Sequence, residues 1–219
     1  MTNLILYGHS FSSYTWKALI PLYANGTPFE FRVVGGGNPT DDEFVAAASP
    51  LGQFPVLRDG ERTVFESSVV VEYLHLHHPG PQPLLPADPA AALEVRAMDR
   101  VFDISVVNKM QEIVAEHIRN PGQASPEIAA RVRESLDRAY RWIDRWLAEN
   151  PRTGDAITLV ECAAAPSLFY ADWVYEIPAE LGHLRRWRAH LLALPAVKRC
   201  VDEARPFRSY FPLGAPDRD

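Results

Sequence analysis

Five prolines fall within residues 79–89, and no single helix or strand can run through them. Proline lacks a backbone N–H and fixes φ, so this density predicts an extended linker. Strand and helix patterns alternate before it, whereas residues 90–205 are almost entirely helical in pattern. A chain of 219 residues is long enough for two small domains. We place them at residues 1–80 and 91–219, with the linker at 81–90.

The two halves predict different architectures. The first half shows the order strand, helix, strand, helix, strand, strand, helix, with a hairpin turn at Asp59-Gly60. The second half carries apolar residues at steps of three and four, and a capping box at Thr158 and Glu161 opens one of its helices. We therefore predict an α/β domain (βαβαββα) followed by an all-α helical bundle. The aromatic segment 205–212 should fold back onto the body. The expected helices of the first half run from Ser12 to Tyr23, Thr40 to Ala48 and Ser67 to His77.

Charge, hydropathy and cysteine usage exclude several classes of protein. The formal net charge is −6 with no basic patch, which argues against a nucleic-acid partner. The apolar runs are too short to span a bilayer, and the N-terminal residues do not form a signal peptide. Cys162 and Cys200 have no metal or redox spacing and suit a reducing cytoplasm. His75 and His78 lack further ligands, so we expect no metal.

Three features of the first half can carry chemistry. Ser12 and Ser13 open a helix, whose unpaired N–H groups stabilise an anion or a thiolate, although plain capping explains them too. In the segment 53–57, a proline opens a short strand and is a candidate cis peptide, with an ordinary trans proline as the alternative. Glu66 and Ser67 precede another helix, where they could hold the ammonium and the carboxylate of an α-amino acid, with simple helix capping as the alternative.

In this order along the chain, the three features resemble the cytosolic glutathione S-transferase family. The resemblance covers nearly the whole chain and includes residues 54–57, Glu66-Ser67 with the Val-Val-Val-Glu-Tyr-Leu that follows, and the capping motif at 154–161. It implies a thioredoxin-like first domain that binds glutathione and a helical second domain that lines the pocket for an electrophile. The segment 6–17 is most similar to the serine-type classes, especially zeta.

The resemblance implies a role for each matched residue. Ser12 would stabilise the glutathione thiolate and Ser13 would assist, with the strand-end hydroxyl of Tyr7 as the alternative partner. Tyr14 stands where the zeta class has cysteine, which argues against the zeta isomerase activity. The implied glutathione-binding residues are Ser12, Ser13, Gln53, Phe54, Pro55, Glu66 and Ser67. The candidate residues of the electrophile pocket, for which core packing is the alternative, are Phe11, Phe102, Val106, Met110, Tyr170 and Trp173.

The function implied by this resemblance is a transferase of detoxification type, a homodimer in which the glutathione thiolate attacks a small electrophile. The sequence also departs from the family, because no basic residue lies between Val33 and Leu57 to bind the glycine carboxylate. A non-catalytic glutathione-fold binding or assembly protein and a glutathione-dependent isomerase of the maleylacetoacetate type are the alternatives. The sequence argues strongly against thiol-disulfide exchange, because no cysteine stands at the first helix start.

Overall fold

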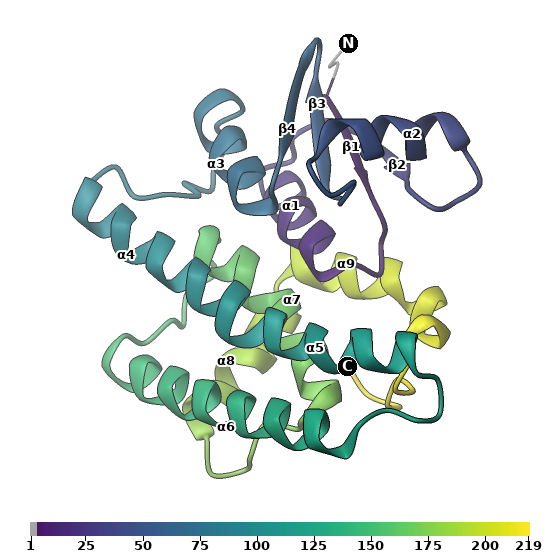
Figure 1. Cartoon of the computed structure of the whole chain (residues 1–219). Helices are drawn as coiled ribbons and strands as arrows, with labels where there is room; N and C mark the ends of the chain where they lie inside the picture. The colour runs from purple at the N-terminus through teal and green to yellow at the C-terminus, as the bar shows by residue number, and fades with distance from the viewer. Residues whose placement is uncertain (1–3) are drawn as a thin grey trace.

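The N-terminal half is built around a four-stranded mixed sheet, as the computed structural model of residues 4–219 shows (Figure 1). Residues 1–3, on which the signal-peptide expectation partly rests, lie outside the described part. The elements of this half are β1 Leu4–Gly8, α1 Ser13–Ala24, β2 Glu30–Val33, α2 Pro39–Ala48, β3 Val56–Asp59, β4 Arg62–Phe65 and α3 Ser67–His77. The sheet order is β2-β1-β3-β4, with β1 and β2 parallel and the other neighbours antiparallel. The predicted βαβαββα order is confirmed.

The side chains of β1 point alternately to the two faces of the sheet and so build two apolar clusters. Leu4 and Leu6 join the main core on the face that α1 and α3 cover. Ile5 and Tyr7 pack instead with Val45 of α2 on the opposite face. This alternation along β1 directs the Tyr7 side chain to the face of the sheet that α2 covers.

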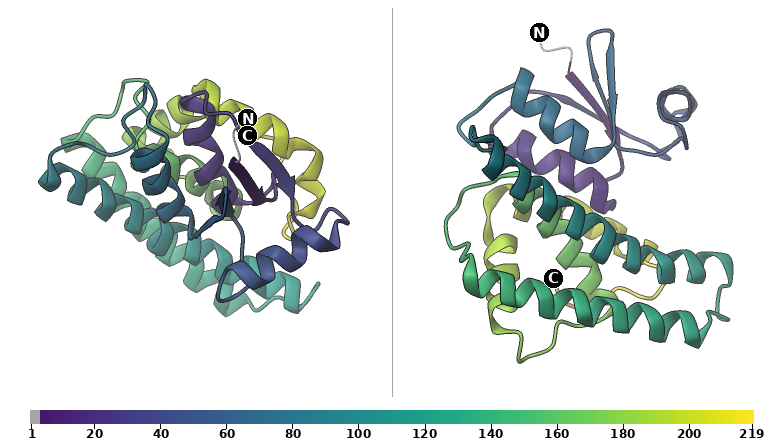
Figure 2. Two further views of the ribbon diagram at one scale, coloured as in Figure 1. Left: turned by 90° about the horizontal axis from the view of Figure 1, so that it is seen from above. Right: turned by 60° about the vertical axis from the view of Figure 1, so that its left-hand side comes forward.

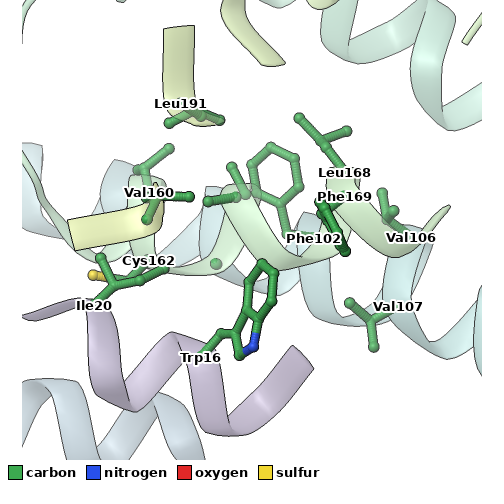
Figure 3. Close-up of a cluster of buried hydrophobic side chains, with 14 of the residues drawn as sticks. Trp16, Ile20, Phe102, Val106, Val107, Val160, Cys162, Leu168, Phe169 and Leu191 are labelled. Atoms are coloured by element: carbon green, nitrogen blue, oxygen red, sulfur yellow. The ribbon is translucent and has the colours of Figure 1, made fainter. Parts of the chain in front are cut away.

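The second half is all helical, as predicted, and it shares a core with the first half (Figure 2). The central helix α7 is buried along almost its whole length and packs against α1. Figure 3 shows Trp16 of α1 near Phe102 and Phe169, and Ile20 of the same helix near Cys162. The elements are α4 Pro89–Arg100, the π-helix η1 Val101–Val107, α5 Asn108–Arg119, α6 Pro126–Glu149, α7 Leu159–Val174, α8 Gly182–Ala193, α9 Pro195–Ala204 and the 3₁₀-helix η2 Arg205–Tyr210.

Three local details differ from the sequence expectation. The π-helical segment η1 between α4 and α5 has no counterpart in the prediction. Helix α2 begins at Pro39 with Asn38 as its cap, because the Asn38 side chain accepts from a backbone N–H of the first turn. The hairpin turn consists of Gly60 and Glu61, one residue later than expected. Gly60 has φ of 60°, a conformation that glycine adopts without steric cost.

The end of the chain folds back, as expected. Phe211 is almost fully buried, and its ring packs edge-on against Trp173 with 5.2 Å between centroids. The predicted capping box is also present, because Thr158 and the Glu161 carboxylate satisfy each other's backbone groups at the start of α7. Within residues 4–219, each helix is too short or too polar to cross a membrane.

Candidate active site

A cavity of about 830 Å³ lies where the two halves of the chain meet. Residues 11–14, residues 49–55 and the pair Glu66-Ser67 form the wall on the side of the sheet. The opposite wall comes from the helical half, between Arg100 and Ile118, and from the C-terminal segment 210–212. The starts of α1 and α3 therefore open into one space. The three sequence features that were expected to act together line this common cavity.

Ser12 occupies the N-cap of α1. Its Oγ accepts a hydrogen bond from the backbone N–H of Thr15 at 3.2 Å, and its own N–H donates to the carbonyl of His9 at 2.9 Å. The hydroxyl hydrogen remains available, because a serine Oγ that accepts one bond can still donate another. Ser13 follows as the first helical residue and is almost fully buried. Such a helix start offers unpaired N–H groups, partial positive charge and a hydroxyl donor, which together favour an anion.

The second feature is a backbone edge around Phe54. The peptide bond between Phe54 and Pro55 is cis. The preceding loop is closed by Ser49, whose Oγ accepts from the Gln53 N–H at 2.7 Å and donates to the Gln53 carbonyl at 3.1 Å. Among residues 4–219, no hydrogen bond uses the backbone N–H or carbonyl of Phe54. Both groups are therefore available to pair with an extended peptide.

The third feature is the entry to α3. Glu66 has φ of 67°, a backbone region that residues other than glycine seldom adopt. Its carboxylate forms no ion pair within the described residues, although it lines the cavity. Ser67, the first residue of α3, is buried and lines the same cavity. The Glu66 carboxylate and the N-terminus of α3 thus lie side by side at a strained backbone position. A ligand with both an ammonium and a carboxylate fits this pair of groups.

A charge network joins the start of α3 to the helical half, where its members Arg100 and Asp103 also line the cavity; it was not anticipated from the sequence. The Lys17 ammonium is 1% exposed; it donates to Asp103 at 2.9 Å and to Ser68 at 2.8 Å and forms an ion pair with Asp99. Arg100 also contacts both carboxylates. Burial raises the pKa of Asp103, while the Lys17 charge opposes that shift. The network ties α1, α3 and the π-helical segment together behind Ser67.

The structure places other candidate residues away from the cavity. Tyr7, the alternative thiolate partner, is 1% exposed; its ring lies 4.6 Å from that of Phe44, and its hydroxyl accepts from Arg32 at 3.4 Å. It does not line the cavity. Of the pocket candidates, Phe11, Met110 and Tyr170 line the cavity, whereas Phe102, Val106 and Trp173 belong to the core.

Comparison with known proteins agrees with this arrangement. Residues 6–82 match the sequence profile of the glutathione S-transferase N-terminal domain. A probable maleylacetoacetate isomerase of Vibrio cholerae is 28% identical over 94% of this chain and 99% of its own length. The GST-like protein YibF of Escherichia coli is 29% identical over 77% of this chain and 82% of its own.

Its first half carries the glutathione S-transferase N-terminal domain, and the whole chain is similar to members of that family. A glutathione S-transferase of Methylobacterium radiotolerans, solved in complex with glutathione sulfonate, superposes with a TM-score of 0.74 at 28% identity, covering 90% of this chain and 94% of the other. A second transferase, from Methylobacillus flagellatus, shares the fold with a TM-score of 0.77 at 23% identity, over 90% and 98% of the two chains. The predicted fold class, a thioredoxin-like domain followed by a helical bundle, is confirmed.

Two signals in the sequence could have revealed the missed charge network. Lys17 lies between Trp16 and Ala18 in an otherwise apolar helix, and a lysine in such a place is buried only when it is paired. Asp99 and Asp103 are four residues apart beside an apolar run. The sequence thus shows one cation and two carboxylates in apolar surroundings. Whether they contact one another depends on how α1 packs against the helical half.

Proposed function

We propose that the protein binds glutathione in this cavity, where Ser12 stabilises the thiolate for attack on a small electrophile. One observation carries the proposal: Ser12 at the start of α1 and Glu66-Ser67 at the start of α3 line the same cavity. A tripeptide thiol needs these groups together, because its γ-glutamyl end group is zwitterionic and its sulfur must become an anion. A related structure with glutathione sulfonate bound supports the choice of ligand.

The chain's own groups account for the γ-glutamyl and cysteinyl parts of such a ligand. The γ-glutamyl carboxylate would lie at the N-terminus of α3 near Ser67, and its ammonium would face the Glu66 carboxylate. The cysteinyl backbone would pair with the N–H and carbonyl of Phe54, beside Pro55 and Gln53. Ser13 adds a second donor near the sulfur. The thiol would lose its proton to solvent, and the Ser12 hydroxyl would then donate to the sulfur anion.

The test is a titration of the bound thiol through its thiolate ultraviolet absorbance. We expect a thiol pKa at least about one unit below the ordinary value of about 8.5, and a return toward that value in Ser12→Ala. The matched control is Ser125→Ala, which also removes an N-cap serine, at α6, but one that does not line the cavity. The role of Ser12 would be refuted by an unshifted thiol pKa in the native complex, or by a lowered thiol pKa that stays low in Ser12→Ala.

A second candidate is a glutathione-dependent isomerase of the maleylacetoacetate type. The Vibrio cholerae relative, a probable maleylacetoacetate isomerase, matches along nearly the whole chain and favours it. It needs the same thiolate, which adds to a carbon–carbon double bond and leaves after bond rotation. A non-catalytic binding protein would keep glutathione affinity without lowering the thiol pKa, so the same titration separates it from both enzymes.

We also propose that two copies assemble into a dimer in the cytoplasm. Exposed apolar side chains occur on adjoining parts of α3 and α4, which the bidentate pair Glu72–Arg96 holds together at 2.8 Å. They are Val69, Leu76 and Leu93, more than half exposed. Two buried free thiols suit a reducing compartment. A role in detoxification is proposed from the family alone.

A further inference from the structure

His9 lies in the loop between β1 and α1, and both its backbone and its ring hold the segment that carries Ser12. The His9 carbonyl accepts from the Ser12 N–H at 2.9 Å, and the His9 N–H donates to Thr15 Oγ1 at 3.3 Å. The ring adds a third bond, because its Nδ1 accepts from the Phe11 N–H at 3.1 Å. Phe11 and Ser12 line the cavity. Hydrogen bonds from one residue behind the cavity wall therefore set the path of the chain into the proposed sulfur-binding position.

The His9 ring also packs against η2, near the end of the chain. Its centroid lies 4.7 Å from that of Phe207, in an edge-on arrangement, and 6.0 Å from that of Tyr210. Tyr210 in turn lines the cavity. The ring thus joins two parts of the cavity wall, the segment before α1 and the C-terminal segment.

The surroundings of the ring favour its neutral form. Burial lowers the pKa of His9, and the ion pairs formed among residues 4–219 do not include this histidine. The titratable group that faces the ring from η2 is the Tyr210 phenol, whereas the charged Arg208 of the same helix pairs with Asp219. From α1 the contact is the uncharged Thr15 hydroxyl. No charge on either element therefore compensates a protonated ring.

Protonation of the ring would remove its bond to Phe11. Nδ1 accepts from the Phe11 N–H only while it carries no proton, so the ring is the neutral tautomer with hydrogen on Nε2. A proton added to Nδ1 would direct a donor at the Phe11 N–H, which is itself a donor. Two donors cannot satisfy each other, and an N–H that loses its acceptor inside the protein is destabilised. The segment from Phe11 to Ser12 would therefore move away from the ring.

We propose that His9 is a positioning residue for the sulfur-binding end of α1, which its neutral ring holds in place and its protonated ring releases. This role rests on the proposed function, because it acts through the Ser12 hydroxyl and the unpaired N–H groups at the start of α1. Those donors favour an anion in the cavity while the segment before α1 is held. Because the held segment excludes the proton from Nδ1, affinity for an anionic sulfur group falls as pH falls.

The probe is glutathione sulfonate, whose sulfonate group stays an anion from pH 7.5 to pH 5. Its binding to the full-length protein is measured by calorimetry across this range. We expect the affinity of the native protein to fall about three- to tenfold between the two limits, as is typical of one weakened hydrogen bond. His190→Asn on α8 is the matched control, because it removes another ring bonded to a backbone group, and it should behave as the native protein.

Two substitutions at His9 separate hydrogen bonding from packing. His9→Asn places an amide Oδ1 near the position of Nδ1, so it keeps an acceptor for Phe11 but has no titratable ring. We expect its affinity at pH 7.5 to stay within about threefold of the native value and to be nearly independent of pH. His9→Leu keeps apolar contact with Phe207 and Tyr210 but has no acceptor, and its affinity should be low at both limits. The native and His9→Asn profiles decide even if His9→Leu does not fold.

Affinity and its pH dependence separate this role from the proposed function. Native protein that does not bind glutathione sulfonate at pH 7.5 would reject the proposed function, and the role of His9 with it. The positioning role alone would be overturned by native affinity that is independent of pH, or by a His9→Asn variant with the native pH dependence. A His9→Leu variant with native affinity would assign the ring to packing against η2 and would overturn that role as well.

Discussion

Lys17→Met should destabilise the protein more than any surface charge change. The ammonium is 1% exposed and faces two carboxylates, those of Asp99 and Asp103, which are themselves almost fully buried. Removing one partner of a buried ion pair costs about 3–5 kcal/mol, because the other charge is left uncompensated. Arg100 still contacts both carboxylates, but half of its side chain is in solvent. We therefore expect a loss of about 2–4 kcal/mol in the free energy of unfolding.

The pH dependence of this loss has a defined sign. Burial raises the pKa of Asp103 in the folded protein, and the Lys17 charge opposes the rise. A folded-state pKa above the unfolded value means that stability falls as pH rises through that window. Without Lys17 the folded-state pKa of Asp103 rises further, so the pH range over which stability falls becomes wider. The deficit of Lys17→Met should be largest at neutral pH and should shrink as pH falls through the folded-state pKa of Asp103, because protonation removes the buried charge that Lys17 compensates.

Urea denaturation at several pH values measures both quantities. Lys198→Met is the control, since its pair with Asp202 is largely exposed and should contribute less than about 1 kcal/mol. The double variant Lys17→Met/Asp103→Asn should recover part of the loss, because it removes the unpaired charge. A loss below about 1 kcal/mol, or a deficit equal at pH 5 and pH 7, would refute the claim that Lys17 compensates buried carboxylates.

Three further predictions concern the site and the assembly. Glu66→Gly should weaken glutathione binding at least about tenfold, as measured by calorimetry. The free energy of unfolding, measured by denaturation, should be unchanged or up to about 1 kcal/mol higher, because glycine relieves the positive φ. A loss of both binding and stability would contradict this prediction. Glutathione and its glycyl monoethyl ester should bind within about threefold of each other, and Gln53→Lys should introduce a preference for the free acid. Leu93→Glu should yield monomers by sedimentation, whereas Trp142→Glu on α6 should not; unchanged dimers would exclude this face.

Local rules predict the fold well where each element is decided by its own residues. The strand β1 is apolar throughout, and the helix starts at Ser13 and Leu159 have side-chain caps that are visible in the sequence. The errors fall where the outcome depends on geometry that spacing does not encode. The π-helical segment is one example, because Val101–Val107 has the same apolar spacing as an ordinary helix. The π-helical turn is recognisable only in the structure, where Asp103 contacts Lys17 of α1.

The same distinction explains which parts of the site were accessible from the sequence. Ser12 and Glu66-Ser67 can be proposed from the sequence, because the residues that open a helix are recognisable from their local pattern. Tyr7 was open as an alternative because its residue type suits a thiolate, yet the alternation along β1 turns it toward α2, away from the cavity. From the sequence, Tyr14 is only a difference from the zeta class, which has cysteine at this position. Its hydroxyl donates to Asn108, which lies 94 residues away, so this polar contact exists only once the two halves pack together. The groups proposed to bind glutathione are therefore local, whereas the contact between Tyr14 and Asn108 is long-range.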